Sequence, residues 1–311
     1  MRSLFPALLA VLIGCAGPSD GQKKGLKPEI VDDSPFTVVV LPDIQYLTLN
    51  PEGEVFRNMM DWILEHREAL NIQMVLQEGD ITHNNTEAEW VEADAGFSML
   101  DGLVPYIVCV GNHDMDGNDA DARDTTRYNQ WFGLDRIEKS ETFFASAAED
   151  NADDHAHIFS AGGVDWMLIS LAYDPTNKAL NWAKGLLEDN PNRVAIILTH
   201  AYLLPSGTTG PQGENIQRKL VDKFSNVRFV INGHYTDGTN ANRRRERNDG
   251  SEVLEIFANY QTMTVSAGGR MRQMWMDPVA GVVDVTSCNA WDVCSEEEGD
   301  TLLFEDLVFA E

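Results

Sequence analysis

The sequence predicts an α/β sandwich in which helices flank mixed β-sheets, and two patterns in the chain predict this fold class. In the first two thirds, short apolar runs rich in β-branched residues alternate with segments of helical spacing. In the last third, strand-like runs follow one another without a helix. A chain of 311 residues with 43% apolar residues can bury the large core that such layers need.

Each expected strand is an apolar run, which is typical of a strand buried on both faces. We expect strands over residues 36–41, 73–77, 105–110, 164–171, 194–199 and 227–232, and shorter ones over 253–258, 271–276 and 282–286. The expected helices, with apolar residues three and four positions apart, cover 55–70, 87–100 and 179–187. Segment 114–156 is polar and acidic, so we expect an insertion or a long functional loop there.

The N-terminus has the pattern of an export signal. One basic residue precedes a short apolar run, which ends in Leu12-Ile13-Gly14-Cys15 and resembles a bacterial lipobox. We therefore expect a signal peptide over 1–14, a flexible tether over 15–35 after a lipidated Cys15, and one domain over 36–311. The protein would be an exported bacterial lipoprotein of the outer membrane, periplasm or cell surface. An ordinary secretory signal is the alternative.

The charge balance limits the partners that the chain can have. Asp and Glu number 50 against 23 Lys and Arg, giving a net charge of −27. Such a chain repels nucleic acids and anionic lipids, so no nucleic-acid-binding surface is expected. The one dense basic run, 243–247, is interpreted either as an exposed loop or as a phosphate clamp near Gly233-His234.

Three cysteines remain beyond Cys15. Cys109 lies within an apolar strand-like run and is expected to be an inert core thiol. Cys288 and Cys294 bracket a short loop and could form a disulfide in an exported protein. Zinc binding by this pair is the weaker interpretation, because no second Cys or His pair is near in the sequence.

Five polar clusters stand just after the carboxyl ends of expected buried strands. Ligands of open α/β sheets collect at that edge. All five clusters offer oxygen or nitrogen donors for hard or borderline metal ions. They are Asp43-Ile44-Gln45, Gly79-Asp80, Gly111-Asn112-His113-Asp114, Thr199-His200 and Gly233-His234. A single histidine after a strand is usually structural, but five such clusters together indicate a metal site.

The order of these motifs resembles the calcineurin-like metallophosphoesterase signature, which runs Asp-x-His, Gly-Asp, Gly-Asn-His-Asp/Glu, His and Gly-His-x-His. The match covers about residues 36–286. The first motif, Pro42-Asp43-Ile44-Gln45, is similar to that of a bacterial subgroup with Pro-Asp-Thr-Gln, and Asn259-Tyr260-Gln261 fits the same subgroup. The resemblance implies a four-layer αββα sandwich of two mixed β-sheets flanked by helices.

The resemblance also implies two divalent metal ions, drawn from Mn, Fe, Zn, Mg or Ca, that share one bridging carboxylate. Such ions bind phosphoryl oxygens and acidify a bridging water, which gives hydroxide near neutral pH. The implied ligands are Asp43, Gln45 and Asp80 for the first ion, and Asp80, Asn112, His200 and His234 for the second.

One histidine is assigned a different role by the same resemblance. His113 would protonate the leaving alkoxide, with Asp114 orienting its ring. His83, His155 and His157 lie outside the motifs, so we expect them to be solvated or to support the site from behind its ligands.

Two positions depart from the family pattern. Gln45 and Thr236 stand where the pattern has histidines, so the first ion loses both nitrogen ligands. Asp43, Asp80 and an amide oxygen remain, with Thr236 or Asp237 as candidates to help. An all-oxygen site favours Mg²⁺, Mn²⁺ or Ca²⁺ over Zn²⁺.

The sequence therefore predicts a metal-dependent hydrolase of phosphoric esters. The motifs leave open whether the substrate is a monoester, a diester, a nucleotide, a phospholipid or a phosphoprotein. The alternative function is that of a non-catalytic surface lipoprotein, which binds metal or phosphate on the same fold. The altered first site is the reason to consider this alternative.

Overall fold

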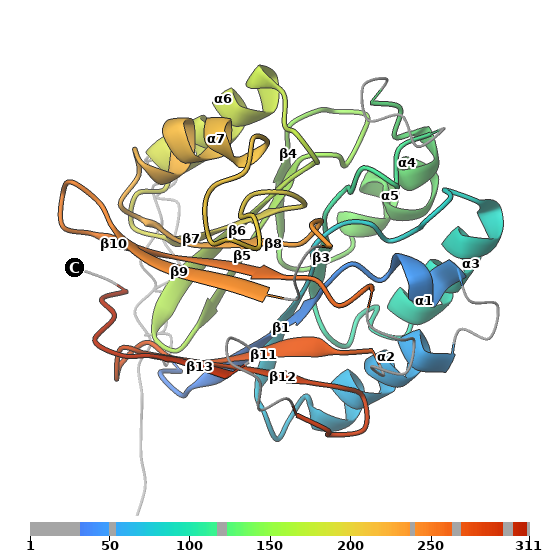
Figure 1. The fold of residues 1–311 in the computed structure, drawn as a ribbon, viewed down its shortest axis with the longest axis horizontal. Helices are drawn as coiled ribbons and strands as arrows, with labels where there is room; N and C mark the ends of the chain where they lie inside the picture. Colours follow the sequence, from blue (N-terminus) through green and yellow to red (C-terminus); the bar gives the residue numbers. More distant parts are fainter. Residues whose placement is uncertain are drawn as a thin grey trace, which may run out of the picture. The chain divides into compact units, whose positions relative to one another are not determined.

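The computed structural model describes residues 32–49, 54–116, 123–236, 240–262, 269–294 and 301–309. Within these ranges, six strands form one mixed sheet in the order β13-β12-β11-β1-β2-β3 (Figure 1). The first strand pairs parallel with β2 and antiparallel with β11, so it is central and buried along its whole length. The strands are β1 (Phe36–Leu41), β2 (Ile72–Gln77), β3 (Tyr106–Val108), β11 (Met271–Asp277), β12 (Val282–Cys288) and β13 (Thr301–Phe304).

A second mixed sheet has the order β4-β5-β6-β7-β8-β10-β9 over the same described ranges. Its central strands β6, β7, β8 and β10 run parallel, and the outer strands β4, β5 and β9 run antiparallel to their neighbours. The strands are β4 (Phe143–Ser146), β5 (His155–Ala161), β6 (Val164–Leu171), β7 (Val194–Thr199), β8 (Val227–Asn232), β9 (Asn240–Glu246) and β10 (Glu252–Ala258).

Helices cover the outer face of each sheet (Figure 1). Helices α1 to α5 pack on the first sheet, while α6, α7 and the π-helical turn Gln217–Val221 pack on the second. The helices are α1 (Gln45–Leu49), α2 (Glu54–His66), α3 (Glu87–Phe97), α4 (Thr126–Phe132), α5 (Leu134–Ile137), α6 (Asn177–Asp189) and α7 (Gly213–Ile216).

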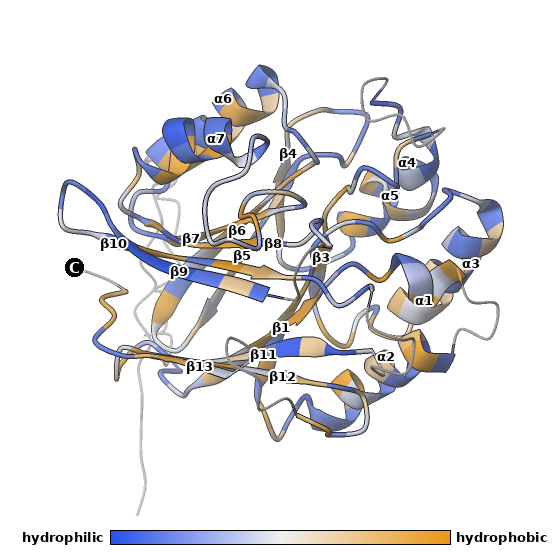
Figure 2. Ribbon diagram, in the orientation of Figure 1, coloured by the Kyte–Doolittle hydropathy of each residue, from blue (hydrophilic) through white to orange (hydrophobic). Residues whose placement is uncertain are grey.

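Alternation along the strands separates the apolar side chains into layers. In β1, Val39 and Leu41 join the cluster under the helices, whereas Val38 and Val40 face the second sheet and join a cluster with Leu198. Apolar residues accordingly concentrate in the strands and on the inner sides of the helices (Figure 2). The predicted αββα sandwich of two mixed sheets flanked by helices is therefore confirmed.

The prediction of a long loop over 114–156 is wrong for much of that segment, and the alternative, an insertion, stays a prediction. The segment contains α4, α5 and β4, and it reaches the first residues of β5. Tyr128 and Phe132 are fully buried, and their rings pack against the ring of Trp90. Most of the Asp and Asn residues that the structure describes in this segment lie outside these short elements, which is why its composition resembled that of a loop.

Most of the basic run lies in β9, so its interpretation as an exposed loop is wrong, while the phosphate clamp stays a prediction. Arg243 and Arg245 form ion pairs with the fully buried Glu255 on the adjacent β10. Arg244 pairs with Glu252, at an Nη2–Oε2 distance of 2.7 Å. The guanidinium groups thus neutralise carboxylates of the neighbouring strand, and β9 stands out as a hydrophilic edge strand in Figure 2.

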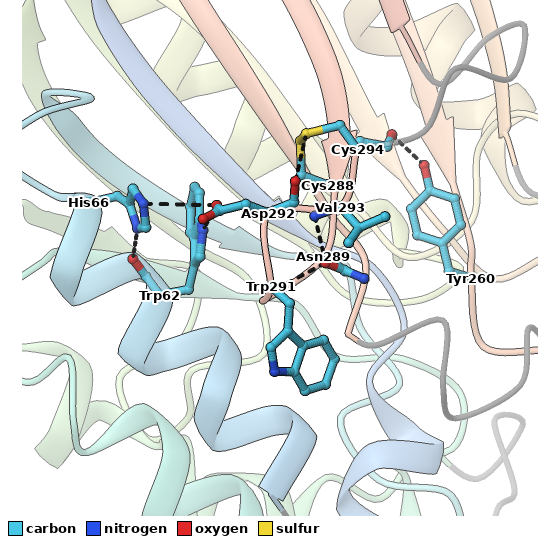
Figure 3. The surroundings of a disulfide bond; sticks show 10 residues. Trp62, His66, Tyr260, Cys288, Asn289, Trp291, Asp292, Val293 and Cys294 are labelled. Carbon is cyan, nitrogen blue, oxygen red and sulfur yellow. Dashed lines mark hydrogen bonds and ion pairs between the residues drawn. A yellow bond between two sulfur atoms is a disulfide. The ribbon is translucent and has the colours of Figure 1, made fainter.

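The disulfide between Cys288 and Cys294 is present in the structure. It closes a loop that lies beside α2 (Figure 3), where Trp62 Nε1 donates a hydrogen bond to Asp292 Oδ1 at 2.5 Å. Cys109 is a buried free thiol within the core between the sheets, in agreement with its predicted structural role.

Residues 1–31, which include Cys15 and most of the predicted tether, lie outside the described residues. The backbone already contacts the domain at Asp32, whose carbonyl accepts a hydrogen bond from Gly163 N at 2.9 Å. Among the described helices, none combines the length and hydropathy needed to cross a membrane.

Candidate metal centre

Polar side chains from both sheets meet at the carboxyl ends of their parallel strands. Asp43, Asp80 and Asn112 follow β1, β2 and β3 of the first sheet, and His200 and His234 follow β7 and β8 of the second. Contacts join the two groups: His200 Nε2 lies 3.2 Å from Asp80 Oδ1, and His234 N donates to Asp43 Oδ1 at 3.2 Å. The site therefore lies where the two sheets adjoin.

His200 is the centre of this arrangement. Besides the contact with Asp80, its Nε2 atom lies 3.1 Å from Asn112 Oδ1 and 3.1 Å from His234 Nδ1. The candidate ligand atoms of Asp80, His200 and His234 all lie within 4.8 Å of one another. Two imidazole nitrogens, a carboxylate and an amide oxygen form a donor set that fits Zn²⁺, Mn²⁺ or Fe²⁺.

The ring of His200 is held in one orientation by the main chain. Its Nδ1 atom donates to the carbonyl of Glu78 at 2.9 Å, which leaves Nε2 to face the other donors. A Cβ atom on Gly79 would lie 2.7 Å from His200 Nδ1, so only glycine fits beside the ring. Burial alone would lower the pKa of His200, but the charges of Asp80 and Asp43 outweigh it and raise the pKa to about 10.

Asp80 is fixed by a close approach of two loops. A Cβ atom on Gly111 would lie 2.2 Å from Asp80 Oδ1, so glycine is required there. Burial opposes ionisation of Asp80, but the charge and hydrogen bond of His200 outweigh it and lower the pKa of the carboxyl. Burial and the charge of His200 lower the pKa of His234 to about 3. A carboxylate and a neutral imidazole are the forms that bind metal.

Asp43 faces the two histidines from the opposite side. Its Oδ2 atom accepts from Asn259 Nδ2 at 2.9 Å, and both oxygens accept from His234 N. Burial first, and the charge of Asp80, raise the pKa of Asp43 to about 8 despite the nearby His200. This buried carboxyl lacks a balancing cation of its own among the described residues, which is the situation that a bound metal ion would relieve.

Gln45 lies near the site, but its side-chain amide forms hydrogen bonds with Gln261 and His83. Its Nε2 atom donates to Gln261 Oε1, and its Oε1 atom accepts from His83 Nδ1 at 3.3 Å. Thr236 is exposed, and Asp237 lies outside the described residues. The structure therefore does not assemble the first-ion set around Asp43 as the family pattern implies it.

His113 and Asp114 are both in place, but Asp114 does not orient the ring of His113 as expected. The His113 ring donates from Nδ1 to the carbonyl of His83 at 2.7 Å and stacks on the His83 ring. The buried carboxylate of Asp114 instead accepts from the backbone N–H groups of Ile81, Thr82 and Gly111. It ties together the loops that follow β2 and β3.

Three residues at the site, Asn259, Gln261 and Glu78, had no assigned role in the sequence analysis, and a fourth, His83, was expected to be solvated or to support the site from behind its ligands. His83 touches Gln45 and His113 and is therefore part of the site. Asn259 and Gln261 follow β10 and bond Asp43 and Gln45, so the Asn-x-Gln spacing after a strand was a usable signal. Glu78 is fully buried beside these residues.

The other two histidines outside the motifs lie elsewhere. His155 and His157 are buried on β5, and their Nδ1 atoms bond Ala152 O and Thr142 Oγ1. The expectation was that these histidines are solvated or support the site from behind its ligands; burial excludes the first alternative, and their bonds to Ala152 and Thr142 do not reach the site.

Comparisons with known proteins agree with this geometry. The family model for calcineurin-like phosphoesterases matches residues 36–235. YvnB of Bacillus subtilis (strain 168) is 30% identical over 258 residues, which cover 81% of this chain; the chain spans only about a fifth (20%) of the length of that relative.

Two solved structures resemble the fold. Purple acid phosphatase PPD1 from yellow lupin superposes with a TM-score of 0.53 at 15% identity, over 88% of this chain and 53% of that one. GAP50, described as the anchor in the inner membrane complex of Plasmodium, gives a TM-score of 0.54 at 12% identity, over 88% and 89% of the two chains. At these identities the likeness concerns the fold alone.

The four-layer fold and the donors at its strand ends define a protein of the metallophosphoesterase class. Because the family model covers well over half of the sequence, the chain belongs to the calcineurin-like phosphoesterase family.

Proposed function

We propose that this protein is a metal-dependent hydrolase of phosphoric esters. The observation that carries the proposal is the convergence of Asp80, Asn112 and His234 on the Nε2 atom of His200, at 3.1 to 3.2 Å. These donors stand at strand ends, and the chain belongs to a family of phosphoesterases. In this family the purpose of such donors is to hold divalent ions against a phosphoryl group.

We assign the ligands of two ions as follows. Asp80, Asn112, His200 and His234 would hold one ion, and Asp43 with Asp80 would form the base of the other. Bound divalent ions supply Lewis acidity towards phosphoryl oxygens and lower the pKa of water. The chain's part is to keep Asp80 ionised, to hold the imidazoles in the correct orientation, and to bury the donors away from bulk solvent.

His113 is the proposed proton donor to the leaving oxygen. The carbonyl of His83 fixes the proton on Nδ1, so Nε2 is the ring nitrogen that exchanges a proton with a substrate. His113 N also donates to Asp80 Oδ1 at 3.0 Å, which places the acid next to the proposed bridging carboxylate.

The test is hydrolysis of nitrophenyl phosphate mono- and diesters by protein that has been freed of metal and then supplied with Mn²⁺. We expect activity with Mn²⁺ and its loss with chelator. His200→Ala should lower kcat/KM by more than about 100-fold. His66→Ala, a variant of the half-buried histidine of α2, should behave like the wild type.

A non-catalytic binding protein on the same fold is the second candidate. It is favoured by the position of Gln45, whose amide bonds Gln261 and His83. Stoichiometric metal binding without cleavage of any ester in a broad panel would establish this candidate instead.

We also propose that the protein is exported and anchored to a membrane through lipid on Cys15, with the following residues as a tether. The support is the lipobox-like Leu12-Ile13-Gly14-Cys15 alone. Metabolic labelling with palmitate should mark the wild type and not Cys15→Ser. A wild type that stays unlabelled in the soluble fraction would refute the anchor. Membership of the Asp-x-Gln subgroup remains a prediction.

A further inference from the structure

A buried carboxylate beside the metal centre takes no part in the proposed mechanism. Glu78 follows β2 and is fully buried, and neither side-chain oxygen has a hydrogen-bond partner among the described residues. Burying a carboxylate without a partner costs several kcal/mol, so such groups are normally paired or bind a metal. The environment of Glu78 therefore lacks a component that would balance its charge.

Strand alternation places this carboxylate under the site. Met74 and Leu76 of β2 point into the core between the two sheets, and Glu78 continues the same alternation. It thus stands at the end of that core where Asp80 and His200 begin the donor cluster. The carbonyl of Glu78 is also the group that accepts the Nδ1 proton of His200.

Glu78 and Asp43 face the same glycine. A Cβ atom on Gly233 would lie 2.1 Å from Asp43 Oδ1 and 3.3 Å from Glu78 Oε2. Two acidic side chains from different strands therefore converge on one side of the loop that carries His234. Since both are buried, their mutual repulsion favours a cation between or beside them.

The nearest buried cation of the protein itself already has other partners. Arg272 points into the same layer from β11, but it donates to Tyr260 Oη at 3.3 Å and to Asn242 Oδ1 at 2.9 Å. It acts on Glu78 through its charge, but neither side-chain oxygen of Glu78 has a hydrogen-bond partner among the described residues.

We propose that Glu78 supplies a carboxylate oxygen to the first metal ion, in place of the imidazoles absent at positions 45 and 236. This inference deepens the proposed function and rests on it. Asp43, Asp80 and Glu78 would then form an all-oxygen set, whereas the other ion has two imidazoles. Oxygen ligands select Mn²⁺ or Mg²⁺ over Zn²⁺, so the two sites would differ in metal preference.

The test compares Glu78→Gln with the wild type in calorimetric titrations of the full-length, metal-free protein with Mn²⁺ alone. Glutamine keeps the shape and removes the charge. The matched control is Glu255→Gln, which neutralises another fully buried carboxylate, located on β10 and paired with Arg243 and Arg245.

We expect two Mn²⁺ sites in the wild type and in Glu255→Gln. In Glu78→Gln, one site should keep its affinity, and the other should weaken at least tenfold. Two unchanged sites in Glu78→Gln would overturn the inference and leave the proposed function intact. A wild type that binds only one ion would also overturn the inference, and a wild type that binds none would overturn both.

Chemical unfolding of the metal-free proteins separates a ligand from a structural ion pair. A buried carboxylate that serves as a metal ligand destabilises the fold when its ion is absent. The urea midpoint of metal-free Glu78→Gln should therefore equal or exceed that of the metal-free wild type. A lower midpoint, or failure of the variant to fold, would show that Glu78 stabilises the fold through its charge interaction with Arg272 and would overturn the inference.

Discussion

His113 and Asp114 are adjacent in the chain, yet their side chains serve different parts of the site. The ring of His113 bonds and stacks with His83, while the carboxylate of Asp114 is buried under backbone N–H groups of two loops. Consecutive residues in a tight turn point in different directions, so sequence proximity did not reveal which group orients the ring. The histidine is the proposed proton donor, and the aspartate maintains the loop that presents it.

His113→Ala should affect substrates according to their leaving groups. A nitrophenolate leaves without a proton, whereas an alkoxide needs one, so the loss of kcat on alkyl phosphates should be about 10²- to 10⁴-fold and the loss on nitrophenyl phosphates much smaller. Steady-state kinetics on the two ester types would measure the difference, with His66→Ala as control. Equal losses on both would remove His113 from this role.

At the scale of elements, the sequence predicted the central strands far better than the edges. β1, β7 and β8 are continuous apolar runs because neighbours cover both of their faces. β9 and β4 are edge strands, and one face of β9 carries arginines that pair with the adjacent strand. The polar sequence of β9 lacks the apolar pattern from which strands are predicted, and β4 has only four residues, too few to show such a pattern.

The same distinction explains which site residues could be predicted. Asp43, Asp80 and His200 each follow an apolar strand. The carboxyl ends of parallel strands lie at the same edge of a sheet, so these residues could be placed together from the sequence. The positions of Glu78 and His83 depend on three-dimensional contacts. Glu78 reaches the site because it continues the alternation of β2, and His83 reaches it because Glu89 fixes the loop in which it lies.

β5 should make stability depend on pH through its buried histidines. Burial lowers the pKa of His155 to about 4, from about 6.5 in an unfolded chain. Between these values the unfolded state binds more protons, so stability is full above about pH 6.5 and falls as the pH drops towards 4. The contribution is on the order of 3 kcal/mol when the proton uptake is complete.

His155→Asn should therefore reduce the loss of unfolding free energy that occurs as the pH falls from about 6.5 towards 4. Urea unfolding with chelator at pH 5 and pH 7 would measure the change in unfolding free energy for the wild type, His155→Asn and the α2 control His66→Asn. The ligand histidines contribute equally to all three proteins, so the difference isolates β5. The same pH dependence in His155→Asn and the wild type would contradict the assignment.

For the whole molecule, the metal centre also joins the two halves of the sandwich. Asp80 and Asn112 come from the first sheet, and His200 and His234 from the second. An ion held by all four would link the sheets at the end of the core that both share. Folding and metal binding should consequently be coupled throughout the domain, because the donor set exists only when both sheets are formed.

Metal removal should therefore lower the stability of the whole domain in one transition. At an ion concentration 100 times the dissociation constant, binding to the folded state alone adds about 2.7 kcal/mol. That corresponds to a rise of several degrees in Tm for a domain of this size. Calorimetric melting with Mn²⁺ and with chelator would measure it. His200→Ala should abolish the difference, because it removes the residue on which the donors of both sheets converge, whereas His66→Ala should retain it. An equal rise in His200→Ala would mean that the stabilising ion binds elsewhere, and a transition that splits in two without metal would mean that the sheets fold independently.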